Sequence, residues 1–153
     1  METPLTRAQA LLFGTLTVGV LDITDALVFF GLRGVAPIRI FQSIASGLLG
    51  RSAYEGGLSI AALGAGLHFF IAFVVVATYY FASRRLPVLV QQPWFCGPLY
   101  GLGVYLVMNL IVLPLSAIGG GPKSLPVLIN GLAIHALGVG LPSALFARAA
   151  GRA

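Results

Sequence analysis

Four long apolar stretches fill most of the 153-residue sequence, and each is long enough to cross a lipid bilayer. A membrane-crossing helix needs about 20 mainly apolar residues, because each residue advances the helix by about 1.5 Å. Only 8% of the residues are charged, and most of these lie outside the four stretches. The sequence therefore predicts an all-α, polytopic membrane protein with a single transmembrane domain over residues 1–153. The expected spans cover residues 8–32, 57–83, 95–117 and 125–148.

The connections between the spans predict how the spans are arranged. Two short connections and one longer one join them, so successive spans are expected to run in opposite directions as an antiparallel four-helix bundle. The longer, first connection contains residues 38–51, where apolar and small polar residues alternate with a period of about 3.6. Pro37 directly before this segment suits a helix start. Because the segment is too short to span a bilayer, it is predicted to be an interfacial or re-entrant helix between helices 1 and 2.

The basic residues that flank the spans favour one orientation. With four spans, both termini and the second connection lie on one side of the membrane, together with Arg7, Arg84, Arg85, Arg148 and Arg152. The other side carries Arg33, Arg39, Arg51 and Lys123. Cytoplasmic loops carry an excess of Lys and Arg, so both termini are expected in the cytoplasm, by a margin of one charge. The net charge of +5 suits anionic lipid headgroups of the bilayer, and no nucleic-acid partner is expected.

A polar or ionisable side chain lies near the middle of each expected span. These residues are Asp22 (with Asp25), His68, Asn109 and His135. An Asp in the middle of a membrane helix costs about 2.5–3.5 kcal/mol, so its presence indicates a functional site. Counted from the expected cytoplasmic ends, the four positions are about 13–15 residues deep, which is about 20 Å along a helix. The sequence therefore predicts one shared polar layer that faces the interior of the bundle.

Small residues lie on the same helix faces as these polar centres. They recur at spacings of three and four, which place residues on one face of a helix. The main small members are Gly57, Ala61, Gly64, Gly101, Gly131 and Gly138. Such residues let helix backbones approach closely in lipid. Tyr105 shares the face of Asn109, and its hydroxyl is expected to join the polar network.

Several strings carry a resemblance to a known group of proteins. They are Asp22 itself, GLRGVAP (31–37), SIASGLLG (43–50), LHF (67–69) and MNLIVLPLS (108–116). In these strings, which are spread over nearly the whole chain, the sequence resembles small bacterial inner-membrane proteins of a YagU-like family. The resemblance implies a location in the bacterial inner (cytoplasmic) membrane. It implies no activity.

The residue pattern favours a layer that binds or relays an ion, a proton above all, or a small solute, as in transport. Asp22 would take up and release a proton, and His68 and His135 would relay or pair with it. Asn109 would orient a solute, with Asp25 and Tyr105 completing the binding set. A chain of this size is expected to form a homo-oligomer or to join a larger membrane complex.

Two alternatives remain open at the level of sequence. His68 and His135 could be the axial ligands of a haem b, or could hold a divalent metal together with Asp22. The protein could also be a non-catalytic accessory subunit of a larger membrane complex, in which the polar layer only fixes helix pairing. An enzyme is less expected, because the sequence has no HExxH motif, no nucleophile elbow and no phosphate-binding glycine loop.

Overall fold

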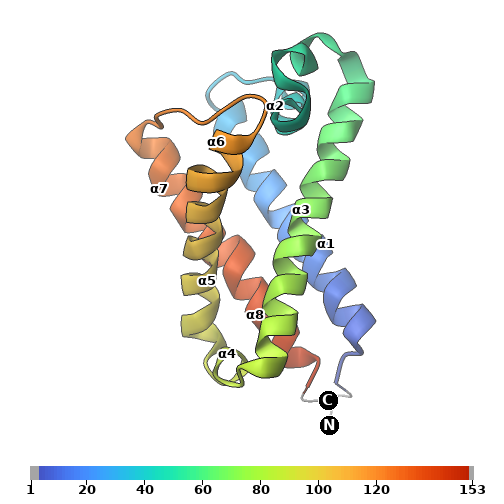
Figure 1. Cartoon of the computed structure of the whole chain (residues 1–153), viewed down its shortest axis with the longest axis vertical. Coiled ribbons are helices and arrows are strands. Elements are labelled where there is room, and N and C mark those ends of the chain that lie inside the picture. Colours follow the sequence, from blue (N-terminus) through green and yellow to red (C-terminus); the bar gives the residue numbers. More distant parts are fainter. Residues whose placement is uncertain (1–3, 152–153) are drawn as a thin grey trace.

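The computed structural model describes residues 4–151, and in this range the chain is helical without any strand (Figure 1). Four helices are long and apolar enough to cross a membrane, as the sequence predicts: Arg7–Gly31, Gly57–Arg85, Pro93–Leu115 and Leu125–Ala149. Their bounds differ from the expected ones by no more than two residues. The first helix, α1 (Arg7–Gly31), begins with a capping box. In it the Thr6 hydroxyl accepts from the Gln9 amide and the Gln9 side chain accepts from the Thr6 amide.

A π-helical segment interrupts each of the last two long helices. In the third, α5 (Pro93–Val107) continues through η2 (Met108–Val112) into α6 (Leu113–Leu115). In the fourth, α7 (Leu125–Ile134) continues through η3 (His135–Gly140) into α8 (Leu141–Ala149). Leu113 donates to the Met108 carbonyl and Leu141 to the Ala136 carbonyl, five residues back in both cases.

Proline explains where the two π-helical segments lie. Leu113 directly precedes Pro114, and Leu141 directly precedes Pro142. Proline lacks an amide hydrogen, and its ring collides with the carbonyl four residues earlier. A wider turn relieves this collision, and single π turns inside α-helices are frequent at functional sites.

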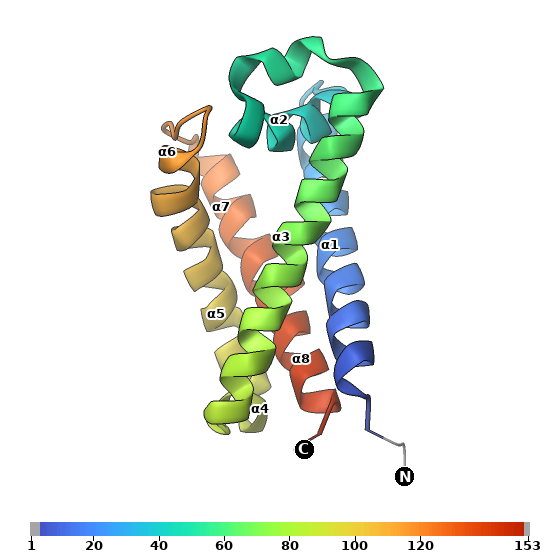
Figure 2. The same ribbon diagram turned by 45° about the vertical axis from the view of Figure 1, so that its right-hand side comes forward.

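The first and the last described residues lie at the same end of the molecule (Figures 1 and 2). The Leu5 amide donates to the Ala149 carbonyl, and the Arg84 guanidinium of α3 (Gly57–Arg85) donates to the Ala147 carbonyl at 2.7 Å. A buried cluster fills this end, and a second one lies further along the same helices. The two clusters are Ala10, Tyr79, Tyr80, Ala144 and Ala147, then Val18, Ala72, Val76 and Val139. This half of the molecule is therefore closed.

The opposite end carries α2 (Pro37–Leu49) and the 3₁₀ helix η1 (Gly50–Glu55), which lie beyond the α1 and α3 ends (Figure 2). α2 packs mainly on α3, where a side chain at Gly64 would overlap the Phe41 carbonyl. Gln42 is only 3% exposed and donates to the Gly57 carbonyl. The helix ends two residues earlier than expected, because Gly50 adopts a φ of +67° and turns the chain.

Candidate binding cavity

A cavity of about 550 Å³ occupies the half of the molecule next to α2. Sites for small molecules have volumes of about 300–1,000 Å³. All six residues expected to form the polar layer line this one cavity: Asp22, Asp25, His68, Tyr105, Asn109 and His135. Most of the other lining residues are apolar. The cavity ends at Val18 and Val139 of the second buried cluster, and on the α2 side it reaches a rim of Arg39, Tyr54 and Lys123.

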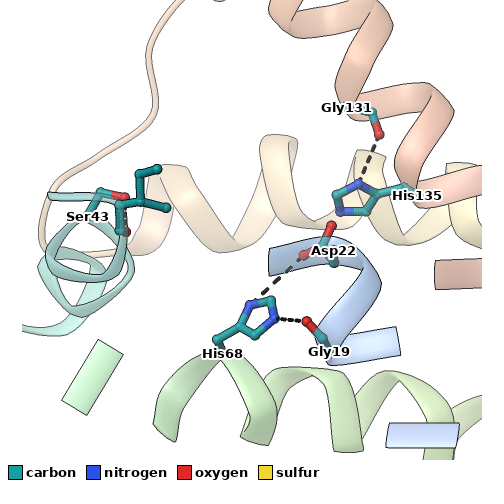
Figure 3. A network of polar contacts seen from close by, with 7 residues as sticks. Gly19, Asp22, Ser43, His68, Gly131 and His135 are labelled. Atoms are coloured by element: carbon teal, nitrogen blue, oxygen red, sulfur yellow. Dashed lines mark hydrogen bonds and ion pairs between the residues drawn. The ribbon is translucent and has the colours of Figure 1, made fainter. Parts of the chain in front are cut away.

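The deepest polar group is a pair formed by Asp22 of α1 and His68 of α3 (Figure 3). His68 Nε2 lies 2.8 Å from the Gly19 carbonyl oxygen. A carbonyl can only accept, so Nε2 carries a hydrogen and donates it. His68 Nδ1 then faces the Asp22 carboxyl, with 3.9 Å between Nδ1 and Oδ2. This is ion-pair distance, and it is longer than a direct hydrogen bond of about 2.7–3.2 Å.

The Gly19 carbonyl therefore fixes the chemistry of the Asp22–His68 pair. With Nε2 protonated, the only ring position left for a second proton is Nδ1, on the side of Asp22. A proton taken up by the pair consequently resides either on Nδ1 or on the carboxyl, and these atoms are 3.9 Å apart. The His68 side chain is 11% exposed, whereas 28% of the Asp22 side chain is exposed, and both residues line the cavity. The pair is a buried acid–base couple with one accessible carboxyl.

His135 contributes a second imidazole from the start of η3. Its Nδ1 lies 2.9 Å from the Gly131 carbonyl and donates to it, which leaves Nε2 as the ring nitrogen able to accept or bind a proton. In the view of Figure 3, Asp22 lies between the rings of His135 and His68. The Tyr105 ring packs edge-on against His135, with 5.2 Å between centroids.

Asp25 lies one turn along α1 from Asp22 and has a partner that sequence reasoning missed. Asn130 of α7 donates to Asp25 Oδ2 at 2.7 Å. An amide inside an apolar span was a usable signal. However, Asn130 is one residue before Gly131 and so lies about 100° away from the small-residue face of its helix.

Tyr105 and Asn109 complete the wall on the side of the third long helix. Asn109 lies in η2 and donates to the Tyr105 carbonyl of its own helix at 2.8 Å. Tyr105 is 5% exposed, and its ring fills the space over Gly131. Its hydroxyl is buried and has no hydrogen-bond partner among residues 4–151. A buried polar atom without a partner is uncommon and calls for an explanation.

The residues of the cavity do not suit a haem or a metal ion. His68 donates through Nε2 to Gly19 and presents Nδ1 to Asp22, so neither nitrogen is directed to an iron. The space above the glycines is also taken, because a side chain at Gly64 would meet Phe41 and one at Gly131 would meet the Tyr105 ring. No group of three or more His, Cys, Asp or Glu in residues 4–151 is arranged to hold a metal.

Comparisons with protein-family models, with curated proteins and with solved structures find no match for this chain. Function is therefore inferred from the chemistry of the cavity itself. An acid–base pair with a fixed tautomer can accept or give up one proton without rearranging its backbone partners. A mainly apolar cavity beside it can hold a small solute.

Proposed function

We propose that the protein binds or relays a proton or a small solute in the membrane, as a transport protein does, at the Asp22–His68 pair. The position of this pair supports the proposal. It lies at the deep end of a cavity that the second buried cluster closes on one side and that reaches a polar rim on the other side. Intramembrane Asp and His side chains mark ion and proton pathways in membrane proteins, because their burial is too costly to persist without a use.

The proposal includes a membrane setting. The four long helices form an antiparallel bundle that crosses the bacterial inner membrane, with both termini in the cytoplasm and α2 lying at the opposite surface. Two observations support this arrangement. Large apolar side chains such as Leu12, Phe70 and Leu110 are exposed along the long helices, as contact with lipid requires. The basic residues slightly favour the terminal side as cytoplasmic.

In this setting the cavity opens to the side of the membrane that carries α2. A proton or solute enters past Arg39 and Lys123, passes Asp25 and reaches Asp22. The packed clusters of the terminal half block further passage. Release to the cytoplasmic side therefore needs a second conformation in which these clusters separate. Binding from the α2 side needs no such change.

Infrared difference spectroscopy during a pH titration of the protein in lipid nanodiscs tests the proposal. We expect a carboxyl band and an imidazole band to change together in the wild type, because one proton is shared by Asp22 and His68. Asp22→Asn should remove both changes. Glu55→Gln is the matched control, because Glu55 is exposed and does not line the cavity. Spectra of Asp22→Asn that equal those of the wild type would contradict the proposal.

A further inference from the structure

We propose that the ligand of the cavity is a hydrophobic organic cation, such as an ammonium or phosphonium group on an apolar body, and that its binding at Asp22 releases the proton held with His68. This inference rests on the proposed function, because it uses the same acid–base pair. It adds the chemical class of the ligand and a one-for-one exchange with a proton.

The distribution of charge in the cavity favours a cation at its deep end. Asp22 and Asp25 are the carboxyls that line it. The amide of Asn130, which is neutral, satisfies Asp25. The basic residues Arg39 and Lys123 lie at the rim, and Arg39 donates to the Tyr54 carbonyl at 2.9 Å. Carboxylates in an apolar cavity create a stronger field than the same groups in water. The deep end therefore attracts positive charge.

The walls favour an organic cation over a metal ion. A hard cation takes six or more oxygen ligands, and the described residues include no metal-binding cluster of three acidic, His or Cys side chains. Around the carboxyls the cavity instead presents apolar and aromatic side chains: Phe29, Phe30, Ile71, Val104, Met108 and Ile134. Aromatic rings attract organic cations through their faces.

The unpartnered Tyr105 hydroxyl is a second, independent sign of a ligand. The side chain is more than nine-tenths buried, it lines the cavity, and the hydroxyl is without a hydrogen-bond partner among residues 4–151. A ligand in the cavity that carries an acceptor atom, or that brings a water molecule with it, would satisfy this hydroxyl.

The exchange of a cation for a proton follows from the charge of the site. Before binding, the proton shared by Asp22 and His68 Nδ1 balances the carboxylate. An organic cation beside the carboxylate does the same, so the proton leaves to water and His68 stays neutral. The net charge of the site is unchanged, which avoids an uncompensated charge in an apolar cavity. Cation and proton therefore compete for one carboxylate.

Other ionisable groups also face this cavity. Asp25 from α1, Tyr105 from α5 and His135 from η3 line it near Asp22, and Arg39, Tyr54 and Lys123 line it at the rim. Of these, His135 is the alternative source of a released proton, since its Nε2 is the ring nitrogen left for a second proton. Its role is separated from that of His68 by comparing His135→Gln with His68→Gln.

The test uses two probes of similar shape and opposite charge, tetraphenylphosphonium and tetraphenylborate. The full-length protein in lipid nanodiscs is titrated with each in weakly buffered solution, and binding and pH change are recorded together. We expect tetraphenylphosphonium to bind and to release close to one proton per cation. Its affinity in the wild type should fall by up to about tenfold for each unit by which the pH is lowered within the range where the free site holds the proton, because proton and cation compete. Tetraphenylborate should bind at least tenfold more weakly and release no proton.

Three variants assign the effect to residues. Asp22→Asn should weaken tetraphenylphosphonium binding at least tenfold, and Glu55→Gln should leave it unchanged. His68→Gln keeps an amide donor for the Gly19 carbonyl but cannot hold the shared proton. It should still bind the cation and should release less than half as many protons as the wild type. His135→Gln should release as many protons as the wild type.

Equal binding of both probes, binding without proton release, or full proton release by His68→Gln would overturn the inference. If Asp22→Asn does not fold, the wild type still tests the inference, because cation affinity that does not fall as the pH is lowered would contradict competition with a proton. If the infrared changes depend on Asp22 but the protein binds no tetraphenylphosphonium, the inference fails and the proposed function stands. If those infrared changes are absent as well, the proposed function also fails.

Discussion

Single glycines determine how closely the helices around the cavity approach one another. A side chain at Gly101 of α5 would overlap the His135 carbonyl of η3, whereas one at Gly103 would have no atom within 4 Å. Gly101→Ala should therefore separate α5 from η3 and destabilise the protein by about 1–3 kcal/mol, as overpacking does. Gly103→Ala should be neutral, or stabilising by up to about 1 kcal/mol from helix propensity. Thermal unfolding of the two purified variants measures the difference, and equal melting temperatures would show that this contact is not close.

At the same scale, the sequence indicated most of the polar residues because a buried charge is conspicuous in an apolar run. Asp22, His68 and His135 stand out for this reason, and the structure brings them to one cavity. The hydrogen bond that fixes the His68 tautomer was not foreseeable, because its acceptor is the backbone carbonyl of Gly19. Every residue has such a carbonyl, so sequence alone does not single one out.

At the scale of elements, the attachment of α2 depends on its contact with α3. A side chain at Gly64 would overlap the Phe41 carbonyl, and one at Gly66 would have no atom within 4 Å. Gly64→Ala should therefore loosen α2, and amide hydrogen exchange over residues 37–49 should become faster. Gly66→Ala is the control and should leave exchange in this segment unchanged. Slow exchange of α2 in Gly64→Ala would mean that contacts other than this one hold it.

The bounds of the long helices were predictable, but their interruptions were not. Length and hydropathy gave the spans to within two residues, because roughly 20 apolar residues have few other stable forms in lipid. Pro114 and Pro142 each lack the amide hydrogen of one backbone hydrogen bond. They did not show whether the helix would kink or widen, since neighbouring helices decide that. The π-helical segments of the structure, with His135 and Asn109 in them, belong to this unpredicted part.

For the whole molecule, the position of the cavity predicts from which side of the membrane a reagent in water can reach a given residue. Ser43 of α2 lines the cavity, and Gln92 is exposed between α4 (Val88–Gln91) and α5 at the terminal end. After Cys96→Ala, Ser43→Cys should react with a membrane-impermeant maleimide in cells whose outer membrane is permeabilised. Gln92→Cys should react only after the inner membrane is broken. Reaction of both from the same side would contradict the proposed spanning arrangement, and an exchanged pattern would reverse the orientation.

The sequence did not predict that one half of the bundle is packed and that the other half encloses a cavity. Each span contains an 18-residue window of high mean hydropathy, and small residues occur in both halves of the spans. Which half closes depends on how side chains of different helices fit together, as Val18, Val76 and Val139 do in the second buried cluster. Such a fit between helices is a property of the assembled chain.

In the proposed membrane setting, the packed plug formed by that cluster has an electrical consequence. Water that enters the hollow half would share the potential of the medium outside, so nearly the whole membrane voltage would drop across the plug. A ligand that reaches Asp22 from the α2 side feels almost none of this voltage. A charge that continues to the cytoplasm crosses nearly all of it, which is worth about 2.3 kcal/mol per elementary charge at 100 mV. If the proposed function is right, binding at Asp22 should therefore be insensitive to the membrane voltage, and only passage on to the cytoplasm should depend on it.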